Sequence, residues 1–332
     1  MPVRMPRHIE LARTPTPLLP LRRLSADLRD AQLWIKRDDL TGLELSGNKV
    51  RKLEFVIAAA QDAGCDTIVT EGAWQSNHCR ATAAACARLG MHAHLLIRPR
   101  PPAPPQGNLL LDRLFGASIE TFEQSEYATR QDRIVADQLE ALRAAGRKPR
   151  FTPMGASEPI GCWGYIRAAA ELAEQLAAAG VDACDVVVAV SSGGTYAGLL
   201  LGVQLFQLRH VTIWGVPVSD DVAHHTRNVT GLCQAVSESF QFPHAFDETQ
   251  LRFIDGYVGE GYAVPYPEEL AALRRLASRE AILLDPVYTG KAFCALLDRV
   301  RDGALGRERP VVFWHTGGVF SDFAWPDVLL EG

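Results

Sequence analysis

Hydrophobic and polar positions alternate along the chain in two recurring patterns. Short apolar runs typical of buried strands occur at Asp66–Thr70, His92–Ile97, Asp185–Val190, Val211–Val216 and Val311–Trp314. Longer Ala- and Leu-rich segments with helical spacing lie at Val50–Ala63, Asn77–Leu89, Tyr127–Ala145, Cys162–Ala179 and Ala197–Leu208. This alternation predicts an α/β fold with largely parallel, twisted sheets and helices on both faces.

The composition narrows the classes of function. The chain has 332 residues, 47% of them hydrophobic, and this length predicts two domains at roughly 150 residues each. Its 34 basic and 39 acidic residues leave a formal charge of −5, so we expect no nucleic-acid partner. No apolar run reaches the ~18–20 residues of a membrane span, and the first residues lack the apolar core of a signal peptide. We therefore expect a cytoplasmic protein without a membrane partner.

The cysteines do not point to a metal site or to disulfides. There are seven of them, widely spread, and no two have the short spacing of zinc ligands. We expect small, buried, reduced side chains and no bound metal.

The loops that follow the predicted strands are the candidate ligand site, because open α/β sheets bind ligands beyond the carboxyl ends of their strands. Three of these loops are unusual: Glu71–Asn77 (EGAWQSN), Ser191–Gly198 (SSGGTYAG) and His315–Gly318 (HTGG). A fourth unusual segment, Ser46–Lys52 (SGNKVRK), opens a predicted helix.

The loop Ser191–Gly198 has the chemistry of a phosphate site. Its two adjacent glycines let the backbone approach an anion at a helix start, and its hydroxyls can add donors. The predicted phosphate contacts are Ser191, Ser192, Gly193, Gly194 and Thr195. A tight turn without a ligand is the alternative. The loop lacks both the Walker A and the GxGxxG pattern, which favours a monophosphate such as pyridoxal phosphate over a nucleotide.

Pyridoxal phosphate requires a lysine for its Schiff base, and only five of the 34 basic residues are lysines. Lys148 lies in a polar, Arg-rich loop, and Lys52 has charged neighbours, so we expect both on the solvated surface. Lys36 stands beside two aspartates at a strand end, where an ion pair is expected.

Two lysines remain as candidates for the Schiff base. Lys49 follows Ser46-Gly47-Asn48, which permits close backbone approach, and begins an apolar helix. Lys291 opens a helix after Asp285–Gly290 (DPVYTG), where a surface position is the alternative. The placement favours Lys49.

Further candidates flank the same loops. Gln75, Ser76 and Asn77 stand at a predicted helix start, where N–H groups and polar side chains suit a carboxylate; a plain N-cap is the alternative. Tyr262 and Tyr288 lie in Gly- and Pro-rich loops, where they either take part in catalysis or only pack.

Ten ordered motifs run almost end to end along the chain: TPLLPL, WIKRDDLTG, LSGNKVRKLE, QSNHCRATAA, GNLLLDRLFGA, WGYIRAA, SSGGTYAG, GYAVP, DPVYTGKA and WHTGG. Together they resemble the D-cysteine desulfhydrase and 1-aminocyclopropane-1-carboxylate (ACC) deaminase family, within the tryptophan-synthase-β-like, fold type II pyridoxal-phosphate enzymes. The plant-type D-cysteine desulfhydrases are the most similar. The resemblance implies a homodimer and a cofactor held between two domains. Residues 49–165 would form a small domain inserted between 1–48 and 166–332, which together form the large one.

The resemblance also implies how the cofactor is held. Lys49 would carry pyridoxal phosphate, Asn77 would hydrogen-bond its phenolic oxygen, and Ser191–Thr195 would hold its phosphate. Thr316, in HTGG, would face the pyridine nitrogen.

For the substrate, the resemblance implies that Ser76 and neighbouring backbone N–H groups bind the carboxylate. Gln75, Asn77 and Thr289 are further candidate substrate contacts. Tyr262 and Tyr288 would flank the leaving group. The family usually has a smaller residue than Trp74 just before QSN, so this indole would either contact the substrate or pack beneath the loop.

The residue after Tyr288 separates activities within the family. ACC deaminases carry VYEG there, and the Glu supports the pyridinium, whereas this chain reads VYTG with Thr289. Neutral hydroxyls at Thr289 and Thr316 would leave the ring nitrogen largely unprotonated and weaken the electron sink. β-Elimination of a good leaving group needs less of that sink than opening of a cyclopropane, so Thr289 favours elimination.

The resemblance therefore predicts a β-eliminating lyase that acts on a small amino acid, D-cysteine first, and releases pyruvate, hydrogen sulfide and ammonia. ACC deaminase and cysteate sulfo-lyase are the alternatives that keep the cofactor; sulfite elimination would require cationic or multiple N–H donors around the side chain. A non-catalytic pyridoxal-phosphate-binding protein is the alternative from another class. Binding alone would not need Ser76, Tyr262 and Tyr288.

Overall fold

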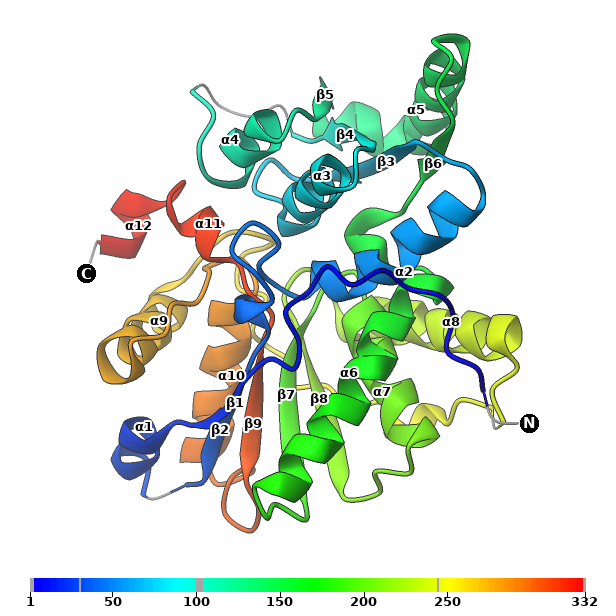
Figure 1. Cartoon of the computed structure of the whole chain (residues 1–332). Coiled ribbons are helices and arrows are strands. Elements are labelled where there is room, and N and C mark those ends of the chain that lie inside the picture. Colours follow the sequence, from blue (N-terminus) through cyan, green and yellow to red (C-terminus); the bar gives the residue numbers. More distant parts are fainter. Residues whose placement is uncertain (1–2, 30, 100–103, 244, 331–332) are drawn as a thin grey trace.

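The strands form two separate sheets, which lie one above the other in Figure 1. The computed structural model describes residues 3–29, 31–99, 104–243 and 245–330. The five-stranded sheet has the order β1-β2-β9-β7-β8 and consists of β1 (Leu18–Pro20), β2 (Leu33–Arg37), β7 (Cys184–Val190), β8 (Val211–Pro217) and β9 (Val311–His315). The four-stranded sheet has the order β5-β4-β3-β6 and consists of β3 (Thr67–Gly72), β4 (His92–Ile97), β5 (Ser118–Thr121) and β6 (Pro149–Phe151).

Parallel pairing dominates both sheets. β9 pairs parallel with β2 and β7, and β7 with β8; β3 pairs parallel with β4 and β6, and β4 with β5. Among the described strands, only β1 runs antiparallel to its neighbour, with Leu18 opposite Lys36 of β2. The predicted α/β class with largely parallel sheets is confirmed.

The helices occupy the segments between the strands. They are α1 (Arg22–Asp27), α2 (Lys49–Asp62), α3 (Asn77–Arg88), α4 (Gly107–Leu114), α5 (Gln124–Ala144), α6 (Pro159–Ala178), α7 (Gly194–Leu205), α8 (Val222–Phe240), α9 (Pro267–Glu280), α10 (Thr289–Arg301), α11 (Val319–Asp322) and α12 (Pro326–Leu330). All five predicted helices are present, with ends displaced by at most three residues. α6 begins earlier than expected because Pro159 occupies its first turn, where the fixed φ of proline suits a helix.

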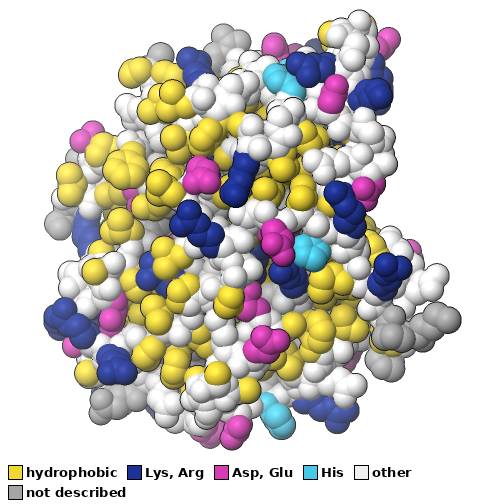
Figure 2. Space-filling model, in the orientation of Figure 1, with side chains coloured by type: hydrophobic (Ala, Val, Ile, Leu, Met, Phe, Trp, Pro, Cys, Tyr) yellow, Lys and Arg dark blue, Asp and Glu magenta, His cyan; other side chains and the backbone are white. Residues whose placement is uncertain are grey.

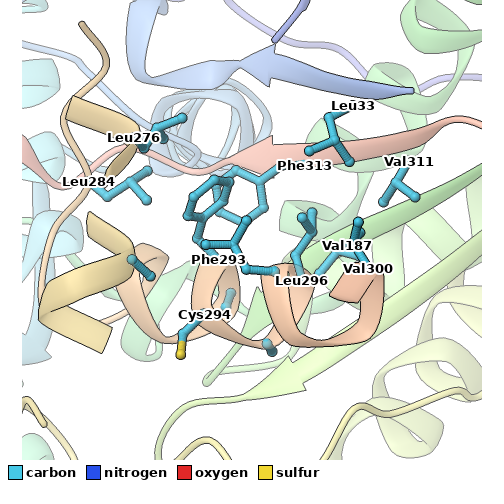
Figure 3. Packing of buried hydrophobic residues seen from close by; sticks show 14 of the residues in the cluster. Leu33, Val187, Leu276, Leu284, Phe293, Cys294, Leu296, Val300, Val311 and Phe313 are labelled. Atoms are coloured by element: carbon cyan, nitrogen blue, oxygen red, sulfur yellow. The ribbon is translucent and has the colours of Figure 1, made fainter. Parts of the chain in front are cut away.

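The five-stranded sheet is buried on both faces. Val187 of β7 and Phe313 of β9 point into a cluster under α9 and α10, where Phe313 meets Phe293 at a ring-centroid distance of 5.0 Å (Figure 3). Val312 and Trp314, the alternate residues of β9, join a second cluster covered by α6 and α7. Burial on both sides explains why the strands read as continuous apolar runs.

The four-stranded sheet takes all its strands from residues 67–151. Ile68 of β3 faces α2 and α3, whereas its neighbour Val69 faces α5. The proposed inserted domain, residues 49–165, contains this sheet; the domain boundaries stay a prediction.

Acidic and basic side chains are interspersed over the face drawn in Figure 2. All seven cysteines are free, and all except the half-buried Cys65 are buried, so the expectation of reduced, buried thiols is correct for six of them. Within the described residues, no helix combines the length and apolar character that crossing a membrane requires, and no group of His, Cys, Asp and Glu side chains could hold a metal ion.

Candidate active site

A cavity of about 330 Å³ lies where strand ends from both sheets meet. Its lining includes Ala73, Arg98, Ser191 and Thr316, which directly follow β3, β4, β7 and β9, and Ser219, the second residue after β8. The carboxyl ends of both sheets therefore face one cavity, as expected for a ligand site in α/β proteins.

Most of the predicted site residues line this cavity. They are Lys49, Ser76, Asn77, Ser191, Ser192, Gly193, Thr195, Tyr262, Tyr288 and Thr316. The predicted residues outside the lining are Trp74, Gln75, Gly194 and Thr289.

The turn between β7 and α7 forms a cradle of polar hydrogens. Gly193 has φ +81°, a backbone conformation that residues with a side chain rarely adopt, so this position favours glycine. The Gly194 N–H donates to Oγ of Ser157 at 3.2 Å, and the Ser157 hydroxyl donates to Oγ of Ser192 at 2.8 Å. Ser191, Ser192, Gly193 and Thr195 line the cavity, whereas Ser157 and Gly194 lie outside its lining and are linked to it through the Ser157–Ser192 hydrogen bond.

Lys52 is buried at this cradle, so its predicted place on the solvated surface is wrong. Its Nζ lies 3.3 Å from Oγ of Ser157. Burial lowers the pKa of Lys52 well below its ordinary value, and the nearby Lys49 lowers it further. Lys49 and Lys52 are three residues apart on α2, which places both on one helix face.

The cradle fits a phosphate monoester. A phosphate is bound by N–H and hydroxyl donors. The start of α7, Ser157 and Ser192 supply such donors, and the Lys52 amine adds N–H donors beside Ser157. The pyridoxal-phosphate interpretation of the turn therefore agrees with the donors present.

Lys49 enters the cavity beside the HTGG segment. Gly47 has φ +102°, and a Cβ there would lie 2.8 Å from the carbonyl oxygen of Thr316. The N–H of Asn48 donates to the same oxygen at 3.0 Å. Burial lowers the pKa of the Lys49 amine to about 8; Asp285 opposes this shift and Arg80 adds to it. A lowered pKa increases the fraction of unprotonated amine, which is the nucleophile for an aldehyde.

The start of α3 presents two donors to the cavity. The Ser76 hydroxyl oxygen caps the helix by accepting from the N–H of Cys79 at 3.1 Å, so its hydrogen stays available to a ligand. Oδ1 of Asn77 accepts from Nδ2 of Asn108 at 3.0 Å. Since Asn77 lines the cavity, its remaining amide group is the NH₂ donor.

Gln75 does not line the cavity because its side chain holds the start of α4. Its Oε1 accepts from the N–H of Asn108 at 2.9 Å, and its Nε2 donates to the carbonyl of Gln106 at 2.8 Å. Trp74 packs against Trp325, with ring centroids 5.7 Å apart. Of the two interpretations of Trp74, the geometry agrees with packing beneath the loop.

Tyr262 and Tyr288 form a pair at the cavity. Their hydroxyl oxygens lie 2.5 Å apart. Burial raises the pKa of Tyr262 to about 12 and that of Tyr288 well above its ordinary value. Both phenols are therefore neutral near pH 7 and can donate a proton or a hydrogen bond.

Thr289 is turned away from the cavity. Its hydroxyl donates to Oδ2 of Asp285 at 2.8 Å and accepts from the Asp285 N–H at 2.8 Å. Oδ1 of Asp285 accepts from the N–H groups of Val287 and Tyr288. Asp285 therefore organises the turn that carries Tyr288, and of the two predicted threonine hydroxyls only Thr316 is at the cavity.

Arg98 lines the cavity and was not among the predicted residues. Its Nη1 lies 3.1 Å from Oε2 of Glu71, and its guanidinium lies 4.0 Å from the ring centroid of Tyr127. Glu71 also accepts a hydrogen bond from the Tyr127 hydroxyl at 2.5 Å. The signal in the sequence was its position directly after a predicted strand, the rule that found the other loops.

Comparisons with known proteins agree with this geometry. The sequence matches the family "Pyridoxal-phosphate dependent enzyme" over residues 9–317. It is 40% identical over 326 residues to the bifunctional D-cysteine desulfhydrase/1-aminocyclopropane-1-carboxylate deaminase, mitochondrial, of Arabidopsis thaliana, covering 95% of this chain and 79% of that one. It is 41% identical over 327 residues to the D-cysteine desulfhydrase of Klebsiella pneumoniae (strain 342), covering 97% of each.

A solved structure has the same fold as this chain. The crystal structure of an ACC deaminase homologue superposes with a TM-score of 0.87 at 35% identity, over 98% of this chain and 96% of that one. The resemblance and the fold class predicted from the motifs are confirmed. With its donor cradle, its buried amine and these relatives, the chain belongs to the pyridoxal-phosphate dependent enzymes, in the group that includes the D-cysteine desulfhydrases.

Proposed function

We propose that this enzyme catalyses β-elimination on D-cysteine: D-cysteine and water give pyruvate, hydrogen sulfide and ammonia. The observation that carries the proposal is the presence, in one cavity, of the Lys49 amine with a lowered pKa and two neutral tyrosine hydroxyls. Relatives covering nearly the whole chain are named D-cysteine desulfhydrases, which supports the same substrate.

The cofactor would be held by groups of this chain. When bound, pyridoxal phosphate supplies an electron sink for the carbanion formed at Cα of the substrate. Lys52, Ser157 and Gly193–Thr195 would hold its phosphate, the NH₂ group of Asn77 its phenolic oxygen, and Lys49 its aldehyde carbon. Thr316 would stand at the pyridine nitrogen.

The chain's own groups would then move the protons. Ser76 and the N–H groups of the α3 start would bind the substrate carboxylate. The Lys49 amine, displaced by the substrate, would remove the Cα proton, since its pKa of about 8 leaves it partly unprotonated near pH 7. Tyr262 or Tyr288 would donate a hydrogen bond to the departing thiolate, which leaves with the electron pair of the C–S bond.

A product assay tests this function. The purified holoenzyme is incubated separately with D-cysteine, L-cysteine, ACC and cysteate, and sulfide, sulfite, pyruvate and 2-oxobutyrate are measured. Sulfide and pyruvate in equal amounts from D-cysteine are expected. Dominant 2-oxobutyrate from ACC would instead identify an ACC deaminase, and no product from any of the four would favour a non-catalytic binding protein.

Arg98 supports cysteate sulfo-lyase as a second candidate function. Sulfite is a bulky anion that requires cationic or multiple N–H donors near the side chain of the substrate. Arg98 lines the cavity and lies close enough to Tyr262 to oppose the rise that burial causes in the Tyr262 pKa. Arg98→Met would then abolish release of sulfite from cysteate while sparing release of sulfide from D-cysteine. Wild-type enzyme without activity on either enantiomer of cysteate would reject this candidate.

We also propose a cytoplasmic homodimer, in line with the sequence resemblance. Light scattering coupled to size exclusion would give twice the mass of the 332-residue chain, and cell fractionation would place the enzyme with the cytoplasmic proteins. A monomeric mass would reject the dimer.

A further inference from the structure

Lys291 is a buried lysine that the proposed chemistry does not use. It lies in the first turn of α10, and its side chain is fully buried rather than at the surface. Its Nζ donates to the carbonyl oxygens of Val258 at 2.6 Å and Gly261 at 2.8 Å. Gly261 directly precedes Tyr262, so the Lys291 amine is hydrogen-bonded to the backbone next to a residue that lines the cavity.

The segment that Lys291 holds has no regular secondary structure. It runs from the end of the short helix Glu248–Gln250 to Pro267, where α9 begins. Gly259, Gly261 and Ala263 all have positive φ, at +68°, +155° and +58°. A left-handed alanine costs roughly 1 kcal/mol, so contacts outside the segment must fix this conformation.

The first turn of α10 is therefore connected to both tyrosines, Tyr262 and Tyr288. Tyr288 is the residue before the helix, and Lys291 is three residues further on. Tyr288 is fixed through the chain itself and through Asp285, whereas Tyr262 is fixed through the two hydrogen bonds of the Lys291 ammonium. Burial lowers the pKa of Lys291, and the nearby Glu269 and Asp285 oppose this shift.

We propose that Lys291 is a positioning residue that sets the Tyr262 hydroxyl against the Tyr288 hydroxyl, so that the pair can stabilise the departing thiolate. This inference rests on the proposed β-elimination. It assigns Lys291 no contact with substrate or cofactor; its ammonium acts through the backbone of residues 258–261.

Two leaving groups separate this role from a merely structural one. The variant Lys291→Met keeps an unbranched side chain, one atom shorter than that of lysine, and removes the donors. Thiolate departure uses the tyrosine pair, whereas chloride leaves β-chloro-D-alanine without a proton. We expect kcat to fall about 30-fold with D-cysteine and less than about threefold with β-chloro-D-alanine. In a Tyr262→Phe background, Lys291→Met should have little further effect on D-cysteine.

Hydrogen exchange provides a readout that needs no turnover. In Lys291→Met the amides of residues 258–264 should exchange faster, while those of α10 keep the rate of the wild type. Lys148→Met, a change at an exposed lysine, is the matched control and should alter neither measurement. If Lys291→Met does not fold, Lys291→Gln, which keeps one donor group, should give smaller changes in the same direction.

The possible outcomes are distinct. Equal losses with both substrates, additive effects with Tyr262→Phe, or unchanged exchange at residues 258–264 would overturn the positioning role. Wild-type enzyme that turns over neither substrate would reject the proposed β-elimination instead, and the exchange experiment would still decide whether Lys291 holds the segment.

Discussion

Ser76 and Asn77 each have their acceptor oxygen hydrogen-bonded within the protein and a donor group free to bind a ligand. The oxygen of Ser76 is taken by the cap of α3, and Oδ1 of Asn77 is taken by Asn108, so each presents a donor. Such prior pairing fixes the direction of each donor before the ligand arrives and lowers the entropy lost on binding.

The amine of Lys49 gives a prediction about pH. At pH 7 a pKa of about 8 leaves roughly one amine in ten unprotonated. The rate at which apoenzyme captures pyridoxal phosphate, followed by absorbance, should rise with pH and level off above about 8. A rise that continued to the ordinary lysine value of 10.5 would contradict the buried amine.

Lys52 gives a prediction about cofactor affinity. A charge-assisted hydrogen bond contributes about 1.5–3 kcal/mol, which corresponds to roughly a 10- to 100-fold change in affinity. Lys52→Met should weaken cofactor binding by this factor in equilibrium dialysis, whereas Lys148→Met should not. Unchanged affinity in Lys52→Met would remove Lys52 from the phosphate cradle.

The sequence was informative wherever local chemistry decides the structure. Glycine at 193 reflects a turn of positive φ at a helix start, and Asn77 begins its helix as predicted. Lys52 was misassigned because its charged neighbours suggested a solvated face. Arg51 pairs with Asp38, however, and Glu54 accepts from the N–H of Leu11, so both charges are satisfied by distant segments that local pattern cannot show.

At the scale of elements, a buried ionic cluster ties α2 to the five-stranded sheet and to α6. Arg51 of α2 donates to both carboxylate oxygens of Asp38, at 2.8 and 3.0 Å, and to Glu171 of α6 at 2.9 Å. Lys36 of β2 pairs with the same Glu171, which agrees with the ion pair predicted for Lys36. Because α2 begins with Lys49, this cluster holds the helix that carries the lysine proposed to bind the cofactor.

Asp38 should make the free energy of unfolding depend on pH in the acidic range. Burial alone would raise its pKa, but Arg51 and Lys36 outweigh burial and hold it at about 2, below the ordinary 3.8. A carboxylate whose pKa is lower in the folded than in the unfolded chain stabilises the fold at pH values above its unfolded pKa. This contribution is lost as the pH falls through the folded pKa. The free energy of unfolding should therefore drop by about 2 kcal/mol between pH 4 and pH 2 on account of this group.

The variant Asp38→Asn tests this origin. Removing one partner of a buried ion pair costs about 3–5 kcal/mol, and the pH-dependent drop should become smaller because the titrating group is gone. Urea denaturation at several pH values measures both effects. Asp62→Asn, which breaks an exposed pair with Arg7, should change stability by less than about 1 kcal/mol. Similar losses of unfolding free energy in Asp38→Asn and Asp62→Asn would contradict a special role for the buried Asp38.

At the scale of the whole molecule, the cavity is assembled from both sheets. Ser76, Asn77 and Arg98 come from the part with the four-stranded sheet, whereas Ser191, Tyr262 and Thr316 come from the part with the five-stranded sheet. Neither part holds a complete site. A substrate bound as proposed, with its carboxylate at Ser76 and its side chain at Tyr262, would therefore bridge the two parts, and its binding energy would favour their approach.

A ligand without a leaving group should reveal this bridging. D-Alanine at about 100 times its Kd stabilises the bound state by about 2.7 kcal/mol. At roughly 2 °C per kcal/mol for a chain of this size, Tm should rise by about 5 °C. The radius of gyration from small-angle scattering should fall, and amides 72–77 and 258–264 should exchange more slowly. Ser76→Ala should abolish all three changes. If Tm rose but the radius and the exchange at 258–264 stayed constant, the ligand would bind one part without drawing the other toward it.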